Sequence, residues 1–150
     1  MSLYMETTKI DAVKTAGEIS NLLRMAGAQR IVQDYEPGTG RLISLRFGLP
    51  QKDGTIAGFR LPVRTAPVFE HLQRQVSPRF RERKADDHRE QAERVAWRQI
   101  LRWTQAQLAL TETGMVATQE VFFPYLLVTP ERTAYEDFAA TGRLLAPVSD

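Results

Sequence analysis

The sequence predicts an α+β fold: an N-terminal helix, a three-stranded antiparallel meander and a second helix, followed by a long charged helix and C-terminal helices. Three patterns indicate this order. Apolar residues recur with helical spacing in residues 15–26 and alternate with polar residues between positions 41 and 63. Residues 79–113 then contain neither glycine nor proline, so a helix there would extend roughly 50 Å.

The first helix is expected to begin at Thr15. Thr15 and Glu18 have the spacing of a capping box, in which each side chain satisfies a backbone amide at the start of a helix. Gly27 would end the helix, because glycine readily adopts the left-handed conformation that terminates helices. Four apolar residues at helical spacing should be buried: Ile19, Leu22, Leu23 and Ala26.

Three segments are typical of strands in a meander. The first covers residues 29–35 and precedes a turn rich in proline and glycine at 36–40. The second covers residues 41–48, where Ile43, Leu45 and Phe47 alternate with polar residues and are expected on the buried face. An Asp-Gly turn at 53–54 leads into the third strand, residues 55–63. Its buried face would carry Ala57, Phe59, Leu61 and Val63.

Thr65 and Pro67 are start signals for a short second helix, with Phe69 and Leu72 as buried residues. Together with the first helix and the meander it completes a small α-β-β-β-α unit over residues 1–76. Residues 77–150 are expected to form a helical extension. Its main element is the long helix, predicted over residues 78–113 between a Ser-Pro start signal and Gly114.

The two halves of the long helix differ in composition. Its second half carries a broad apolar arc: Ala96, Trp97, Ile100, Leu101, Trp103 and Leu108. This setting favours core packing of the two tryptophans over stacking on nucleic-acid bases. Residues 79–90 have only Phe80 and Ala85 as apolar residues, so we expect these turns to project into solvent or onto a partner.

The C-terminal part contains two further helix signals. An apolar segment with Pro124 follows Gly114 and predicts a helix that kinks or ends near the proline, although an extended segment is also compatible. A Thr-Pro start at 129–130 and a stop at Gly142 predict a last helix over residues 130–141. Tyr135 and Phe138 would be its buried positions.

Composition restricts the class of protein. The chain has 150 residues and no cysteine, which excludes disulfides and thiolate metal sites. No run approaches the roughly 18 apolar residues of a membrane span, and no signal-peptide pattern opens the sequence, so we expect a cytoplasmic protein. The net charge is only +2, but residues 1–104 hold 18 basic and 12 acidic residues, whereas residues 105–150 hold 2 and 6. This asymmetry is compatible with a basic nucleic-acid-binding face or with head-to-tail contact between protomers.

No enzyme motif is present. The glycines occupy hairpin positions instead of a phosphate-binding loop. The two histidines, His71 and His88, cannot build a metal site alone, and Asp86 and Asp87 beside His88 lie at consecutive helical positions that point apart. We therefore expect a protein that is not an enzyme and that uses no cofactor and no metal.

The arginines are the candidates for binding, because a guanidinium donates two parallel hydrogen bonds to a phosphate. Eight basic residues lie along the long helix: Arg79, Arg81, Arg83, Lys84, Arg89, Arg94, Arg98 and Arg102. Arg46 and Arg60 on the sheet could extend the same surface. The alternative is that the interleaved acidic residues pair with these cations at i, i+4, which is typical of an ordinary solvated helix face.

Two segments resemble a known group of proteins. The run AERVAWRQILRWTQAQLALTETGMVATQEVFFPYL (Ala92 to Leu126) and the N-terminal TAGEISNLLRMAGA are similar to segments of small proteins encoded in phage and prophage genomes. The resemblance covers most of residues 15–126. It implies a phage setting and a host-cell cytoplasmic location, but the family has no assigned activity. Proteins of this kind include DNA-handling factors, host-defence inhibitors and small structural proteins.

The helix, three strands and helix also resemble the double-stranded RNA-binding domain in their order. That module binds phosphates through lysines at the start of its second helix, whereas residues 65–70 here contain no lysine. Two hypotheses follow for function. The first is a non-catalytic phage accessory protein that binds DNA or RNA through the arginine-rich helix. The second is a homo-oligomeric interaction protein assembled through the long helix, acting as a host-defence inhibitor, a small-ligand sequestering protein or a structural protein.

Overall fold

A computed structural model describes residues 2–142. The α+β order predicted from the sequence is confirmed. The elements, in chain order, are α1 (Ala12–Met25), β1 (Arg30–Tyr35), β2 (Leu42–Pro50), β3 (Ile56–Arg60), α2 (Ala66–Arg74), the 3-10 turn η1 (Pro78–Phe80), α3 (Arg81–Glu112), α4 (Thr118–Phe122), the 3-10 turn η2 (Phe123–Tyr125), β4 (Leu127–Thr129), β5 (Arg132–Thr133) and α5 (Ala134–Thr141).

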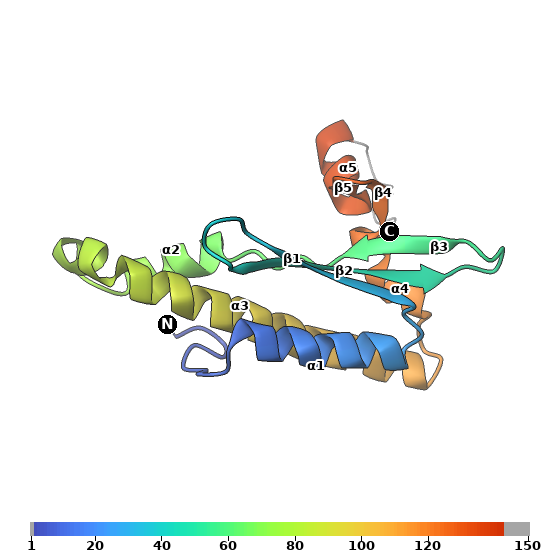
Figure 1. Ribbon diagram of the computed structural model, residues 1–150, viewed down its shortest axis with the longest axis horizontal. Coiled ribbons are helices and arrows are strands. Elements are labelled where there is room, and N and C mark those ends of the chain that lie inside the picture. Colours follow the sequence, from blue (N-terminus) through green and yellow to red (C-terminus); the bar gives the residue numbers. More distant parts are fainter. Residues whose placement is uncertain (1, 143–150) are drawn as a thin grey trace, which may run out of the picture.

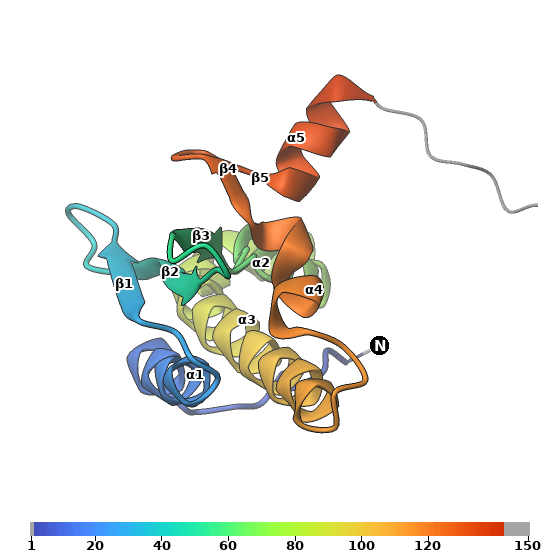
Figure 2. The same ribbon diagram turned by 90° about the vertical axis from the view of Figure 1, so that its right-hand side faces the viewer.

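The long helices and the sheet form two layers. Strands β1, β2 and β3 make an antiparallel sheet in that order, as the meander predicted. Figures 1 and 2 show α1 and α3 side by side along one face of this sheet, while α5 stands on the opposite side. The alternation of β2 and β3 places Leu45, Phe47 and Phe59 on the helix-covered face, where all three are buried.

A β-bulge changes one predicted orientation in β2. Asp34 pairs with Ser44 and Tyr35 pairs with Leu42, so Ile43 is the extra residue without a partner on β1. The bulge shifts the alternation by one position. The prediction that Ile43 is buried is therefore wrong: its side chain is 46% exposed, and Leu42 is buried instead.

Helix α1 begins earlier than the sequence predicted. It starts at Ala12, so Thr15 lies within the first turn and does not cap the helix. The hydroxyl of Thr15 is buried and accepts a hydrogen bond from Arg98 of α3 at 3.3 Å. The Thr15 hydroxyl, which the capping pattern assigned to the start of the helix, therefore bonds to α3 instead. The end at Gly27 is confirmed, with φ of 105°.

One hydrophobic core spans the predicted boundary at residue 76. Buried residues of α1 and the sheet, such as Ile19 and Leu45, cluster with Trp97, Leu101 and Phe122 from the later part of the chain. The indole nitrogen of Trp97 donates to the carbonyl of Leu42 at 3.3 Å. The core role expected for this tryptophan is confirmed, and α3 is the element that both parts share.

The start of α3 packs on an element of the same chain. Helix α2 lies against α3, and the guanidinium of Arg81 donates to the carbonyl of Gln73 at 2.9 Å. Figure 1 shows α2 beside the first turns of α3 at one end of the molecule. The expectation that residues 79–90 project only into solvent or onto another molecule is therefore wrong in part, because one side of these turns is covered by α2.

The C-terminal elements differ from the prediction in two respects. The α-helix α4 ends at Phe122, and the 3-10 turn η2, which contains Pro124, follows it as predicted for a helix that ends near the proline. Residues 127–133 form a small hairpin instead of helix, and α5 begins only at Ala134. The capping pair is Thr133 with Glu136, which replaces the predicted start at 130. Tyr135 and Phe138 are 53% and 36% exposed, so their predicted burial is also wrong. Helix α5 extends away from the core and buries none of its residues.

Candidate nucleic-acid interface

Two of the predicted phosphate-binding arginines serve the fold instead. Arg98 is only 7% exposed and lies between α1 and α3, where it forms an ion pair with Glu18 at 3.1 Å. Arg81 donates to the carbonyls of Gln73 and Val76 and so fixes the connection between α2 and α3. The guanidinium of Arg98 is thus enclosed by the protein, and the Nε of Arg81 is used by the two backbone carbonyls.

The two sheet arginines are held by carboxylates. Both the Nε and an Nη of Arg46 donate to Asp34, at 2.8 and 2.9 Å, and Ser44 donates to the same carboxylate. These hydrogen bonds lower the pKa of Asp34 and so favour its ionised form; the bonds from Arg46 have the largest effect, followed by the bond from Ser44. The two side chains tie β1 to β2 on the sheet face opposite the long helices.

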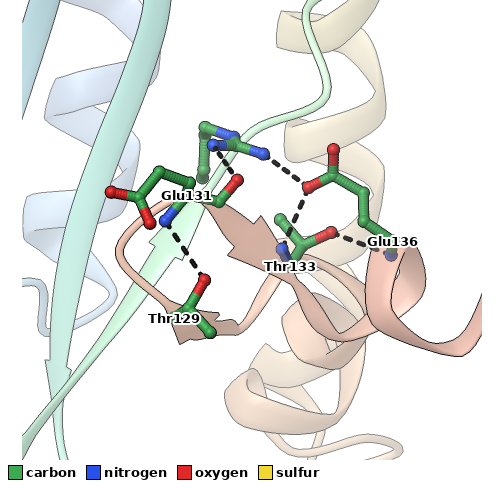
Figure 3. Close-up of polar contacts among 5 residues, drawn as sticks. Thr129, Glu131, Thr133 and Glu136 are labelled. Atoms are coloured by element: carbon green, nitrogen blue, oxygen red, sulfur yellow. Dashed lines mark hydrogen bonds and ion pairs between the residues drawn. The ribbon is translucent and has the colours of Figure 1, made fainter. Parts of the chain in front are cut away.

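Arg60 joins the sheet to the C-terminal elements. It pairs with the carboxylate of Glu136 and donates to the backbone carbonyl of Glu131. Figure 3 shows that Glu136 also accepts from the amide of Thr133, whose hydroxyl caps α5 in return. The Thr133 amide is the main reason that the pKa of Glu136 is lowered; the positive charge of Arg60 acts in the same direction. This arrangement is a structural tie, not an open cationic site.

Three arginines along α3 contact neighbouring side chains of α3 or of α2. Arg89 pairs with Asp86 at 2.9 Å and lies over the ring of Phe69. Arg94 is half-buried and bonds to Gln91, while exposed Arg102 bonds to Gln105. The basic residues predicted along the long helix therefore do not form one exposed series, since Arg98 is buried and Arg94 is half-buried.

Four basic residues close to one another in the sequence are exposed at the α2–α3 junction. We call this group the basic tip, and it consists of Arg74, Arg79, Arg83 and Lys84. Residues 74–84 hold five basic side chains and one acidic side chain. Within residues 2–142, none of the four tip residues forms an ion pair with a carboxylate. Figure 1 places this junction at one end of the molecule, away from the sheet.

Local sequence explains how the tip is built. Ser77 and Pro78 interrupt the helical structure between α2 and α3. The short turn η1 then reverses the chain direction, so that α3 runs back along α2. Phe80 is half-buried and contacts the guanidinium groups of Arg79 and Arg83, whose central carbons lie 4.6 and 5.3 Å from the ring centre. A guanidinium over an aromatic face is attracted by the ring and keeps its hydrogen-bond donors at the edge.

Arg74 is the tip residue that the sequence analysis missed. It lies in the last turn of α2, only four residues before Pro78. The sequence feature that could have identified Arg74 is its position shortly before the helix-breaking pair Ser77-Pro78. Such a pair brings the end of one helix beside the start of the next. A cation near a helix C-terminus is also favoured by the helix dipole.

The described part of the chain offers little for metal chemistry. Residues 2–142 contain no group of three or more His, Cys, Asp or Glu side chains placed to hold an ion. None of the helices within this range is both long and apolar enough to cross a lipid bilayer.

Comparison with protein-family models, with curated proteins and with solved structures finds no match for this chain. The resemblance to small phage and prophage proteins therefore stays a prediction.

Proposed function

We propose that the protein is a non-catalytic nucleic-acid-binding protein that contacts backbone phosphates through the basic tip. The observation that supports this proposal is the group of four exposed cations, Arg74, Arg79, Arg83 and Lys84, without acidic partners at one end of the molecule. Unpaired guanidinium groups bind phosphate without first breaking an internal ion pair. The proposal reduces the ten predicted contacts to three of them, with Arg74 added.

Binding of this kind is electrostatic and independent of base sequence. Each phosphate contact releases counterions, so four contacts to duplex DNA predict a slope of about −3.6 for log K against log salt. The guanidinium groups of Arg79 and Arg83 already contact the ring of Phe80. The proposed binding therefore uses phosphate contacts and does not include stacking of a base on this ring. Single and double strands should both bind, with a weaker salt dependence for single strands.

The alternative function, an assembly through the long helix, has less support from the exposed surface of α3. After Arg94 its exposed side consists mainly of polar or small residues, among them Arg102, Gln105, Ala106 and Ala109. Helix pairing needs a stripe of apolar side chains at helical spacing. The apolar arc of α3 is already covered by α1, the sheet and α4.

The first prediction concerns charge reversal at the tip. We expect the triple variant Arg79→Glu, Arg83→Glu, Lys84→Glu to lose at least about tenfold in affinity for a labelled 20-nucleotide DNA at low salt, because repulsion replaces attraction. Acidic residues are favourable near a helix start, so the fold should persist. Fluorescence anisotropy measures affinity, and circular dichroism verifies folding.

The matched control makes the same change in net charge elsewhere. Arg24, Lys52 and Arg102 are exposed and lie outside the tip, so the variant Arg24→Glu, Lys52→Glu, Arg102→Glu should lose far less affinity. Equal losses in the two triple variants would contradict a localised site. Absence of binding by the unmodified protein to both single-stranded and duplex DNA and RNA would reject the function itself.

A further inference from the structure

The outer edge of β1 has no strand partner among residues 2–142. In the order β1-β2-β3, β1 has a strand neighbour only on one side within this range. The other edge strand, β3, is covered in part by a bridge between Phe59 and Leu126 and by β4. Figure 2 shows α1 beneath the sheet, β2 on one side of β1 and no strand of the described residues on its outer side. Unpaired edges are templates for pairing with another strand.

The hydrogen bonds of the sheet show which residues face this edge. The amide of Leu61 bonds to the carbonyl of Leu45, so odd-numbered residues of β2 bond toward β3 and even-numbered residues toward β1. On β1 the partners of those even residues are Arg30, Val32 and Asp34. The backbone groups of Ile31 and Gln33 therefore point to the free edge.

The side chains of β1 are self-complementary in one register. If two copies of β1 pair antiparallel about a two-fold axis at Val32, Ile31 exchanges backbone bonds with Gln33 of the second copy. Arg30 then lies directly opposite Asp34, twice, and Val32 lies opposite Val32. These side chains share the sheet face that the long helices do not cover.

Neighbouring registers lack this match. A shift that places Gln33 or Ile31 on the axis sets a charged residue opposite Val32. Larger shifts set Arg30 opposite Arg30 or Asp34 opposite Asp34, and like charges directly opposite are destabilising. Within residues 2–142 Arg30 forms no ion pair. Asp34 bonds to Arg46 and Ser44, yet a carboxylate has about four acceptor positions and can accept a further donor.

We propose that two copies of this chain associate through β1 in this register, which joins their three-stranded sheets into one continuous sheet. The partner is a second copy because the pattern that fits the edge is the strand's own pattern. This surface lies apart from the basic tip, so the proposal does not depend on nucleic-acid binding.

Cysteine substitution tests the register, because the natural chain has no cysteine. Opposed residues in a non-hydrogen-bonded antiparallel pair have Cβ atoms about 4.5–5.5 Å apart, close to the span of a disulfide. Under mild oxidation Val32→Cys should form a covalent dimer on a non-reducing gel. Gln33→Cys and Ile31→Cys are the matched controls and should cross-link at least about tenfold less.

Light scattering on the unmodified chain over a concentration series should approach twice the monomer mass. Arg30→Glu should raise the dissociation constant of the dimer about tenfold or more, because the introduced carboxylate would lie opposite Asp34 of the second copy. Arg24→Glu on α1 should leave this constant unchanged. A monomeric mass at every concentration would overturn the proposal. So would a dimer in which Gln33→Cys or Ile31→Cys cross-links best, or one in which none of the three does.

Discussion

At the scale of single residues, Arg98 differs most from its predicted role. The sequence placed Arg98 among the eight basic residues of the long helix that were candidates for phosphate binding. In the fold, Arg98 is buried against Thr15 and Glu18 of α1. These residues lie 83 and 80 positions earlier in the chain. The Nε of Arg98 has no hydrogen-bond partner among the described residues. A buried cation in this position makes the fold depend on its acidic partner.

The second prediction uses this dependence. We expect Glu18→Ala to destabilise the protein by about 2 kcal/mol, because it leaves the buried guanidinium without a carboxylate; the roughly 3–5 kcal/mol of a fully buried pair is reduced by the partial exposure of Glu18. Arg98→Met should cost less, about 1 kcal/mol, since Glu18 can then turn to water. Urea denaturation measures both values.

The double variant Glu18→Ala, Arg98→Met provides the control. Once the cation is absent, loss of Glu18 should have little further effect, so the double variant should be more stable than Glu18→Ala alone. Additive costs of the two substitutions would show that the pair does not act as a unit.

At the scale of elements, local patterns predicted well where one element determines its own form. The glycine- and proline-free run became η1 and α3, and the alternation of β3 placed Phe59 and Leu61 in the core. The errors lie where another element intervenes. The bulge opposite Asp34 exposes Ile43, and the approach of α3 takes Thr15 from its capping role.

Helix α5 is the element whose stability depends most on polar contacts, because none of its residues is buried. The third prediction is that Glu136→Gln weakens it. Glutamine keeps the cap position but loses the ion pair with Arg60, which is worth at most about 1 kcal/mol at a partly exposed site. Amide hydrogen exchange within α5 should become faster at neutral pH, while α3 stays protected.

The pH dependence of α5 has a defined sign. The folded pKa of Glu136 is lowered, so its contribution to stability is present above the unfolded value of about 4.3 and is lost as the pH falls through the folded value. Unmodified α5 should therefore fray in acid, and Glu136→Gln should reduce this dependence, with the ion pair of Asp137 and Arg132 left in place. Glu131→Gln, an equal charge change in the neighbouring turn, is the control. An α5 that responds to acid equally in both variants would contradict the assignment.

At the scale of the whole molecule, the core is shared between the two parts that composition suggested. Side chains from α3 and α4 fill the space between α1 and the sheet, with Trp97, Leu101 and Phe122 fully buried there. A division at residue 76 would remove these three large side chains from the cluster that Ile19 and Leu45 belong to.

The fourth prediction follows from this shared core. A fragment of residues 1–76 should lack a cooperative unfolding transition, because the apolar faces of α1 and the sheet would meet water instead of α3. Circular dichroism and NMR dispersion on the fragment measure this, with residues 1–142 as the folded control. A fragment that unfolds cooperatively would support the division into two units at residue 76.

Sequence alone determined the element types up to the end of α3 and the basic character of the chain before residue 105, but not the β4–β5 hairpin. These properties depend on backbone preferences and on neighbours within about four positions, which a linear pattern records. Tertiary structure decided which cations remain exposed. Arg81, Arg98 and Arg60 are occupied by partners from other segments, while Arg74 joins Arg79, Arg83 and Lys84 only because α2 folds back on α3. Contacts between distant segments depend on how helices pack, and spacing along the chain does not encode that packing directly.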